Sequence, residues 1–131
     1  MNTILTLVVY MALITWITLL GAALFRARSW TASGMQVALG NRDNLAPATP
    51  LGGRADRTAK NTMENFVLFA ALALVAQAAG KTSSEVVQGA QIFFWARIAY
   101  IPIYYAGIPY VRTAVWVVSI IGLALMVRAL L

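Results

Sequence analysis

Four long runs of apolar residues constrain this chain more than any other feature of its sequence. They fall at about residues 2–26, 54–79, 84–105 and 109–130. Each run is close to the ~20 residues that a helix needs to cross the hydrocarbon core of a bilayer. Hydrophobic residues make up 61% of the 131 residues, well above the usual apolar content of a soluble domain. The sequence therefore predicts one all-α membrane domain, a bundle of four transmembrane helices.

The connections between these runs differ in length. Residues 27–53 form a long segment rich in Gly, Pro, Ser and Asn, which predicts irregular backbone that acts either as a lid or as a solvated linker. The second connection is short: Gly80 is placed to end one helix, and Thr82 to cap the next, with Glu85 reaching back to the backbone. Pro109 opens the last helix at its favoured first position.

The charged residues are distributed unevenly along the chain. The net charge is +6, and most of the basic residues fall in and around the first connection: Arg26, Arg28, Arg42, Arg54, Arg57 and Lys60. This asymmetry is typical of the cytoplasmic side of a membrane protein. We therefore expect the first and third connections in the cytoplasm and both termini outside. No basic stripe alternates with aromatic residues, so nucleic-acid binding is not expected.

The residue types that are missing exclude several classes of chemistry. The chain has no Cys and no His, which excludes thiol nucleophiles, disulfides, Cys/His zinc sites and Ser-His-Asp triads. Only four acidic residues are present, so a metal site built from carboxylates is not expected.

A polar face is predicted on the helix at residues 54–79. Arg54, Arg57, Asn61 and Glu64 are spaced by three, four and three residues, which places them on one face. Ionisable side chains in membrane segments cost roughly 2.5–3.5 kcal/mol each at the helix centre and usually face protein or a water-filled cavity. Glu64 therefore marks a candidate functional site. Asp56 and Lys60 are expected to form a separate surface ion pair.

The last two helices carry a second set of polar residues. Arg97, Tyr100 and Tyr104 are spaced by three and four residues on one face. Arg97 needs a partner, and we predict an interaction with Glu64, made directly or through a bound ligand. Arg112, near the start of the last helix, can hold a carboxylate or stabilise a thiolate. A purely structural ion pair and interfacial anchors remain open as alternatives.

These positions resemble the signature of a known family, the membrane-associated proteins in eicosanoid and glutathione metabolism (MAPEG). The family includes microsomal glutathione transferases. The resemblance covers nearly the whole chain and is carried by two motifs and a basic residue that opens the fourth helix: Arg57-x-x-x-Asn61-x-x-Glu64, Arg97-x-x-Tyr100-x-x-x-Tyr104 and Arg112. It implies a homotrimer of four-helix subunits, with glutathione bound between neighbouring subunits near the cytoplasmic side.

The resemblance also implies roles for single residues. Glutathione, as co-substrate, would be held by one set of side chains: Arg57, Asn61, Glu64, Arg97, Tyr100, Tyr104 and, at the end of the first helix, Arg28 or Arg26. Arg112 would stabilise the glutathione thiolate. The implied activity is a transferase or peroxidase acting on lipophilic electrophiles that arrive from the bilayer, in a bacterial inner membrane. Two other functions stay open: a small proton-coupled transporter that uses Glu64, and a non-catalytic membrane protein that retains the fold.

Overall fold

The computed structural model describes residues 1–43 and 45–131 and is all-helical over these residues. The helices run in chain order as α1 (Thr3–Ala27), α2 (Ala32–Leu39), α3 (Pro50–Ala78), α4 (Ser84–Ala106) and α5 (Pro109–Leu130). All except the short α2 are long and apolar enough to cross a membrane. The chain is therefore an integral, multi-pass membrane protein, as the apolar runs predict.

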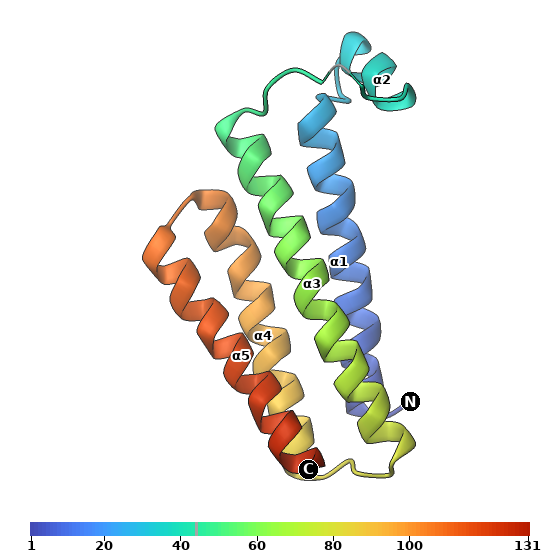
Figure 1. Ribbon diagram of the computed structural model, residues 1–131, viewed down its shortest axis with the longest axis vertical. Coiled ribbons are helices and arrows are strands. Elements are labelled where there is room, and N and C mark those ends of the chain that lie inside the picture. Colours follow the sequence, from blue (N-terminus) through green and yellow to red (C-terminus); the bar gives the residue numbers. More distant parts are fainter. Residues whose placement is uncertain (44) are drawn as a thin grey trace.

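The four long helices run alternately up and down (Figure 1). Helix α1 packs mainly against α3, and α4 packs mainly against α5, so the bundle consists of two helix pairs. Both termini lie at one end, and α2 lies at the other end with the long first connection (Figure 1). We call these the terminal end and the α2 end.

An apolar core joins the two pairs toward the terminal end. Phe69 of α3 and Phe93 of α4 are fully buried, and their rings stack with centroids 4.5 Å apart. Within the second pair, Gly89 of α4 lies directly against Gly122 of α5. A Cβ on Gly89 would lie 2.6 Å from the Gly122 carbonyl oxygen, so only glycine allows these two helices to approach so closely. Small residues serve the same purpose in other membrane bundles.

Toward the α2 end, the two pairs are joined by polar contacts. The Arg54 Nε donates a hydrogen bond to the Tyr105 carbonyl oxygen at 3.0 Å, and the Arg57 Nε donates to the Tyr104 hydroxyl at 3.0 Å. These contacts bridge the space between α3 and α4, whereas aromatic rings fill the corresponding space in the core.

The first connection is more ordered than the sequence predicts. It contains the eight-residue helix α2, whose N-terminus is capped by the Thr31 hydroxyl. It also ends earlier, because α3 begins at Pro50 and not near residue 54. The Thr49 hydroxyl accepts a hydrogen bond from the Gly52 amide at 3.0 Å, and a proline directly after such a cap is pre-organised for the first helical turn.

At the second and third connections, the structure confirms most of the residues predicted to end or begin the helices. Gly80 follows the C-cap residue Ala79 of α3 and has a φ of 67°, a conformation that favours glycine. Pro109 is the first residue of α5. The predicted capping box is wrong: Ser83, and not Thr82, caps α4. Glu85 accepts hydrogen bonds from Arg128 of α5, because this strong cationic donor lies within its reach.

Candidate functional site

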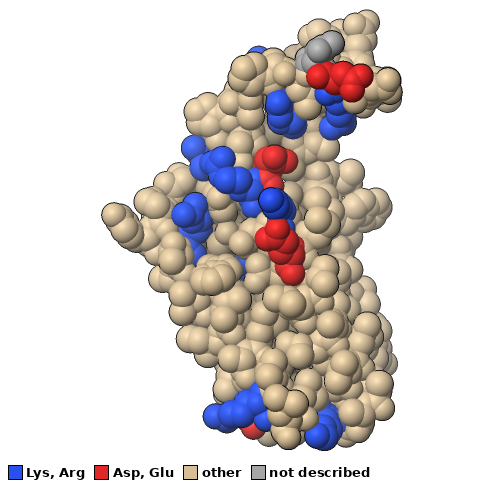
Figure 2. Space-filling model, viewed as in Figure 1, with Lys and Arg blue, Asp and Glu red and all other residues tan. Residues whose placement is uncertain are grey.

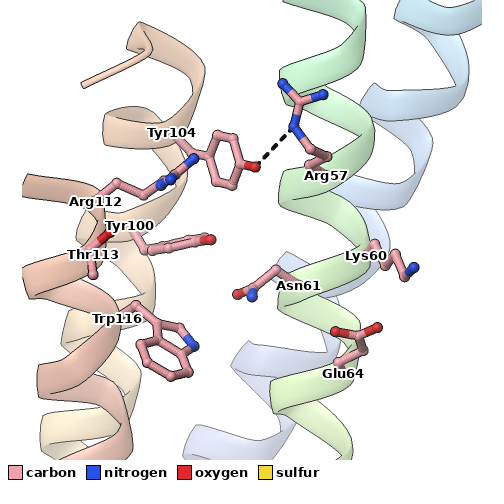
Figure 3. Close-up of a pocket in the computed structure, with 9 residues that line it drawn as sticks. All are labelled: Arg57, Lys60, Asn61, Glu64, Tyr100, Tyr104, Arg112, Thr113 and Trp116. Carbon is pink, nitrogen blue, oxygen red and sulfur yellow. Dashed lines mark hydrogen bonds between the residues drawn. The ribbon is translucent and has the colours of Figure 1, made fainter. Parts of the chain in front are cut away.

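An open cleft of about 340 Å³ lies between α3 on one side and α4 and α5 on the other, toward the α2 end. This volume is at the lower end of the ~300–1,000 Å³ range of small-molecule sites. The cleft is lined by residues from all three helices (Figure 3): Arg57, Lys60, Asn61, Glu64, Tyr100, Tyr104, Arg112, Thr113 and Trp116. It therefore brings together six of the eight side chains that the sequence selects.

Helix α3 supplies the polar wall of the cleft. Arg57, Asn61 and Glu64 follow one another down the helix, as their spacing predicts, and Asn61 points across the opening toward α4 and α5 (Figure 3). Glu64 is exposed, so its carboxylate is accessible to a ligand. In order along the helix, this wall offers a guanidinium, an amide and a carboxylate.

The opposite wall is built around Tyr104. Its hydroxyl accepts the Arg57 hydrogen bond, and its ring lies under the Arg112 guanidinium, with Cζ 4.6 Å from the ring centroid. Cations placed over an aromatic face are attracted by the ring quadrupole. Tyr104 thus links α3, α4 and α5 and holds two cationic groups at one end of the cleft. Tyr100 lies one helical turn away and packs edge to face with Tyr104 at 5.5 Å.

Arg97 is placed differently from the prediction. It is fully buried, its guanidinium lies 4.0 Å from the centroid of the Tyr100 ring, and its Nη2 donates to the Thr62 hydroxyl at 3.1 Å. Within the described residues, the Arg97 Nε and Nη1 have no hydrogen-bond partner. Arg97 does not line the cleft; it lies behind Tyr100.

The predicted direct contact between Glu64 and Arg97 is wrong. Arg97 takes Thr62 as its partner, and in the described part of the chain the ion pairing of acidic residues is confined to Glu85 and Arg128. The reason is helical geometry. Residues two apart point in widely different directions, so when Thr62 faces α4, Glu64 cannot face it as well.

Several residues of the cleft were not identified from the sequence. Thr113 and Trp116 of α5 line it together with Arg112. The spacing of four residues between Arg112 and Trp116 is a signal that could have identified Trp116, whereas Thr113, next to Arg112, has no such signal. Lys60 also lines the cleft. The predicted ion pair between Lys60 and Asp56 is not formed among the residues described. The Lys60 side chain extends from α3 on the side away from Tyr104 and Arg112 (Figure 3).

Arg28 lies outside the cleft. It ends α1 in the left-handed region, with a φ of 54°, and lines a separate cavity of about 140 Å³ beneath the first connection. Arg26 lines the same cavity, and its Nη1 donates to the Ala46 carbonyl oxygen at 2.5 Å. Neither residue contacts the cleft of its own subunit.

The donor set of the cleft indicates which ligand it suits. Arg57, Lys60 and Arg112 supply three cationic groups, Glu64 supplies one carboxylate, and amide and hydroxyl groups complete the lining. Charged donors and acceptors make the stronger hydrogen bonds. Figure 2 shows Lys, Arg, Asp and Glu gathered in the upper half of the visible face and again at its lower edge, with a broad uncharged region between them. The described residues contain no cluster of acidic side chains able to hold a metal ion. The cleft suits a small organic anion that also carries an ammonium group.

The comparisons with known proteins agree with this architecture. The model of the MAPEG family matches residues 3–131, which is essentially the whole chain. No curated protein and no solved structure matched the chain. The match extends from the start of α1 to the end of α5 and includes every residue of the cleft. The chain therefore belongs to the MAPEG family.

Proposed function

We propose that this protein is a glutathione-dependent transferase or peroxidase that acts on lipophilic electrophiles within the membrane. One observation carries the proposal: helices α3 and α5 bring Arg57, Glu64 and Arg112 to a single open cleft, in a chain of the MAPEG family. Glutathione carries two carboxylates and one amine. Arg57 fits a carboxylate, Arg112 fits the thiolate, and Glu64 fits the amine.

Some residues of the cleft bind glutathione, and another activates its thiol. Arg57 is fixed by its hydrogen bond to Tyr104, so its remaining donors are pre-organised for a carboxylate. Asn61 and Glu64 extend the contact along α3. Glutathione supplies the nucleophilic thiol. Arg112, packed over the Tyr104 ring, stabilises its anionic form, and nearby cations are known to lower the pKa of thiols.

We propose a different role for Arg97, which lies behind Tyr100 and not in the cleft. Its guanidinium packs on the Tyr100 ring and does not line the cleft. In this proposal Arg97 is a positioning residue that fixes Tyr100, and Tyr100 and Tyr104 contact the ligand. This differs from the direct contact that the resemblance implies for Arg97.

We also propose that the protein forms a homotrimer with a defined orientation in the membrane. The cleft is open along one side, and Arg26 and Arg28 lie on α1 away from it. In a homotrimer, a neighbouring subunit would bring one of these arginines to the open side. The basic residues concentrate at the α2 end, which favours a cytoplasmic first connection and both termini outside. We place the protein in a bacterial inner membrane.

The proposal is tested by titrating the purified protein with glutathione in a calorimeter and by following conjugation of a chlorodinitrobenzene-type electrophile. Saturable binding and turnover are expected. Absence of both at millimolar glutathione would contradict the proposal. Proton-coupled uptake in proteoliposomes that is lost in Glu64→Gln would instead support a transporter. A protein that is stably folded but binds no glutathione would support a non-catalytic function.

A further inference from the structure

A second groove lies between α4 and α5 at the terminal end, at the opposite end of the bundle from the candidate site. Its volume is about 670 Å³. Helix α4 contributes Glu85, Gln88 and Gln91, and α5 contributes Leu125 and Arg128. None of these residues takes part in the proposed glutathione site.

The two glutamines are unusual for a membrane-spanning helix. Gln88 and Gln91 are both exposed, and neither amide makes a hydrogen bond to any described residue of the chain. An amide carries two donors and one acceptor. Lipid tails cannot satisfy these groups, so polar side chains in membrane helices normally face protein or water. The exposed amides therefore need a polar partner on this surface, which is either water or the polar part of a lipid.

Their depth indicates which part of a lipid they meet. Glu85, Gln88 and Gln91 follow at intervals of three on one helix face, and each interval descends about 4.5 Å. The polar headgroup region occupies about 5–8 Å on each side of the hydrocarbon core. With Glu85 and Arg128 at the outer edge of the headgroup region, Gln88 lies within that region, and Gln91, about 9 Å below Glu85, lies near its inner boundary, where the ester carbonyls of a phospholipid are.

The two charged side chains of the groove indicate which type of lipid headgroup fits it. The Arg128 Nε donates to the Glu85 carboxylate at 2.7 Å, and the side chains are 74% and 35% exposed. The pair is neutral overall but offers one cation and one anion to a ligand. A phosphate fits the guanidinium, and a primary ammonium fits the carboxylate, whereas a quaternary ammonium has no hydrogen to donate. An anionic headgroup, as in phosphatidylglycerol, has the phosphate but no ammonium for Glu85.

Helices α4 and α5 approach each other closely beneath the groove. Gly89 follows Gln88 directly, and a Cβ on it would lie 2.6 Å from the Gly122 carbonyl oxygen. The close approach of α4 and α5 at this point fixes the spacing between the amides and the ion pair. We infer that this groove binds one zwitterionic phospholipid with a primary ammonium headgroup, the phosphate on Arg128, the ammonium on Glu85 and the ester carbonyls on Gln88 and Gln91.

Native mass spectrometry of the full chain tests this inference. The detergent-solubilised protein is incubated with equal amounts of phosphatidylethanolamine, phosphatidylcholine and phosphatidylglycerol with matched acyl chains. We expect phosphatidylethanolamine to be retained about tenfold more than the other two, which corresponds to one or two additional hydrogen bonds. The double variant Gln88→Leu/Gln91→Leu should lower the retention of all three lipids, because they share the ester carbonyls that the two amides contact. Gln36→Leu, the same change on α2, should keep it.

A second variant keeps the inference testable even if the double variant does not fold. Glu85→Gln retains the size of the side chain but removes the carboxylate, so it should reduce the preference for phosphatidylethanolamine over phosphatidylcholine. An unchanged preference would overturn the inference, as would equal lipid retention in the double variant and in Gln36→Leu. Water-soluble glycerophosphoethanolamine serves as a further probe: if it displaces the lipid at equal concentration, the ligand is a free phosphoester and the lipid assignment is wrong.

Discussion

The terminal end and the α2 end of the bundle are joined by different interactions. Toward the terminal end, Phe69 and Phe93 stack in full burial, and α4 and α5 meet through Gly89 and Gly122. Toward the α2 end, the same helix pairs are connected by the hydrogen bond from Arg57 to Tyr104 and by few other polar contacts. Between the two helix pairs, the apolar half is closed, whereas the polar half leaves a cleft.

The difference shows how a small membrane protein can separate stability from ligand binding. Van der Waals packing needs close contact and therefore excludes a ligand, whereas long polar side chains hold helices at a distance and keep donors available. One helix, α3, contributes to both halves. We therefore expect changes in the apolar half to alter the free energy of unfolding, and changes in the polar half to alter affinity and rate.

The largest expected effect on stability is at the aromatic stack. Phe93→Ala should reduce the free energy of unfolding by about 3–5 kcal/mol, because it leaves a cavity beside Phe69. Denaturant titration in detergent measures the change. Trp95→Ala is the matched control: Trp95 is 65% exposed, and its loss should cost less than about 1 kcal/mol. Equal effects of the two variants would contradict the assignment of the core.

The largest expected effect on rate is at Arg112. Arg112→Ala should lower the conjugation rate at saturating glutathione by about 10²–10³-fold, in the range found when a charge-stabilising group is removed from an active site. The ultraviolet absorbance of the bound thiolate should fall in parallel, with little change in the unfolding midpoint. Arg128→Ala removes an arginine at the terminal end and should leave the rate unchanged. A normal thiolate signal in Arg112→Ala would rule out its proposed role.

A smaller effect on affinity is expected at Arg57. Arg57→Ala should weaken glutathione binding by about 10–100-fold, as expected for the loss of a charged hydrogen bond. At 100 times its dissociation constant, a ligand stabilises the folded state by about 2.7 kcal/mol, so the unfolding midpoint should rise with glutathione in the wild type. At the same glutathione concentration, the rise should be much smaller in Arg57→Ala. An equal rise in both proteins would show that the ligand binds elsewhere.

The smallest expected effects concern the boundary between the two halves, at Arg97 and Thr62. A buried charge with unpaired donors contributes little to stability, so Arg97→Met should leave the free energy of unfolding unchanged or raise it by about 1 kcal/mol. Thr62→Val removes the one hydrogen-bond partner of the guanidinium that the structure describes and should cost about 1 kcal/mol.

Glutathione titration then tests the positioning role of Arg97. Arg97→Met should weaken glutathione binding while keeping the fold, and Tyr100→Phe, which retains the ring over Arg97, should not lower the unfolding midpoint. A strongly destabilised Arg97→Met with unchanged affinity would show that Arg97 is structural and does not position Tyr100.

The candidate site was partly predictable from the sequence because helical periodicity fixes which residues share a face. Arg57, Asn61 and Glu64 line one wall as predicted. Periodicity does not say how one helix is rotated relative to its neighbour. For this reason the partner of Arg97 was predicted as Glu64, whereas the structure gives Thr62.

The sequence by itself determined the four spanning helices, their alternating direction and most of their ends, because these depend on apolar length, on glycine and proline, and on local caps. Only the tertiary structure decided which helices pair, where α3 stands away from α4 and α5, and which polar side chains are buried. Those properties arise from side-chain packing between segments distant in the chain, as in the contacts of Phe69 with Phe93 and of Gly89 with Gly122. Packing of this kind depends on the shapes of both partners, and neither segment encodes it alone.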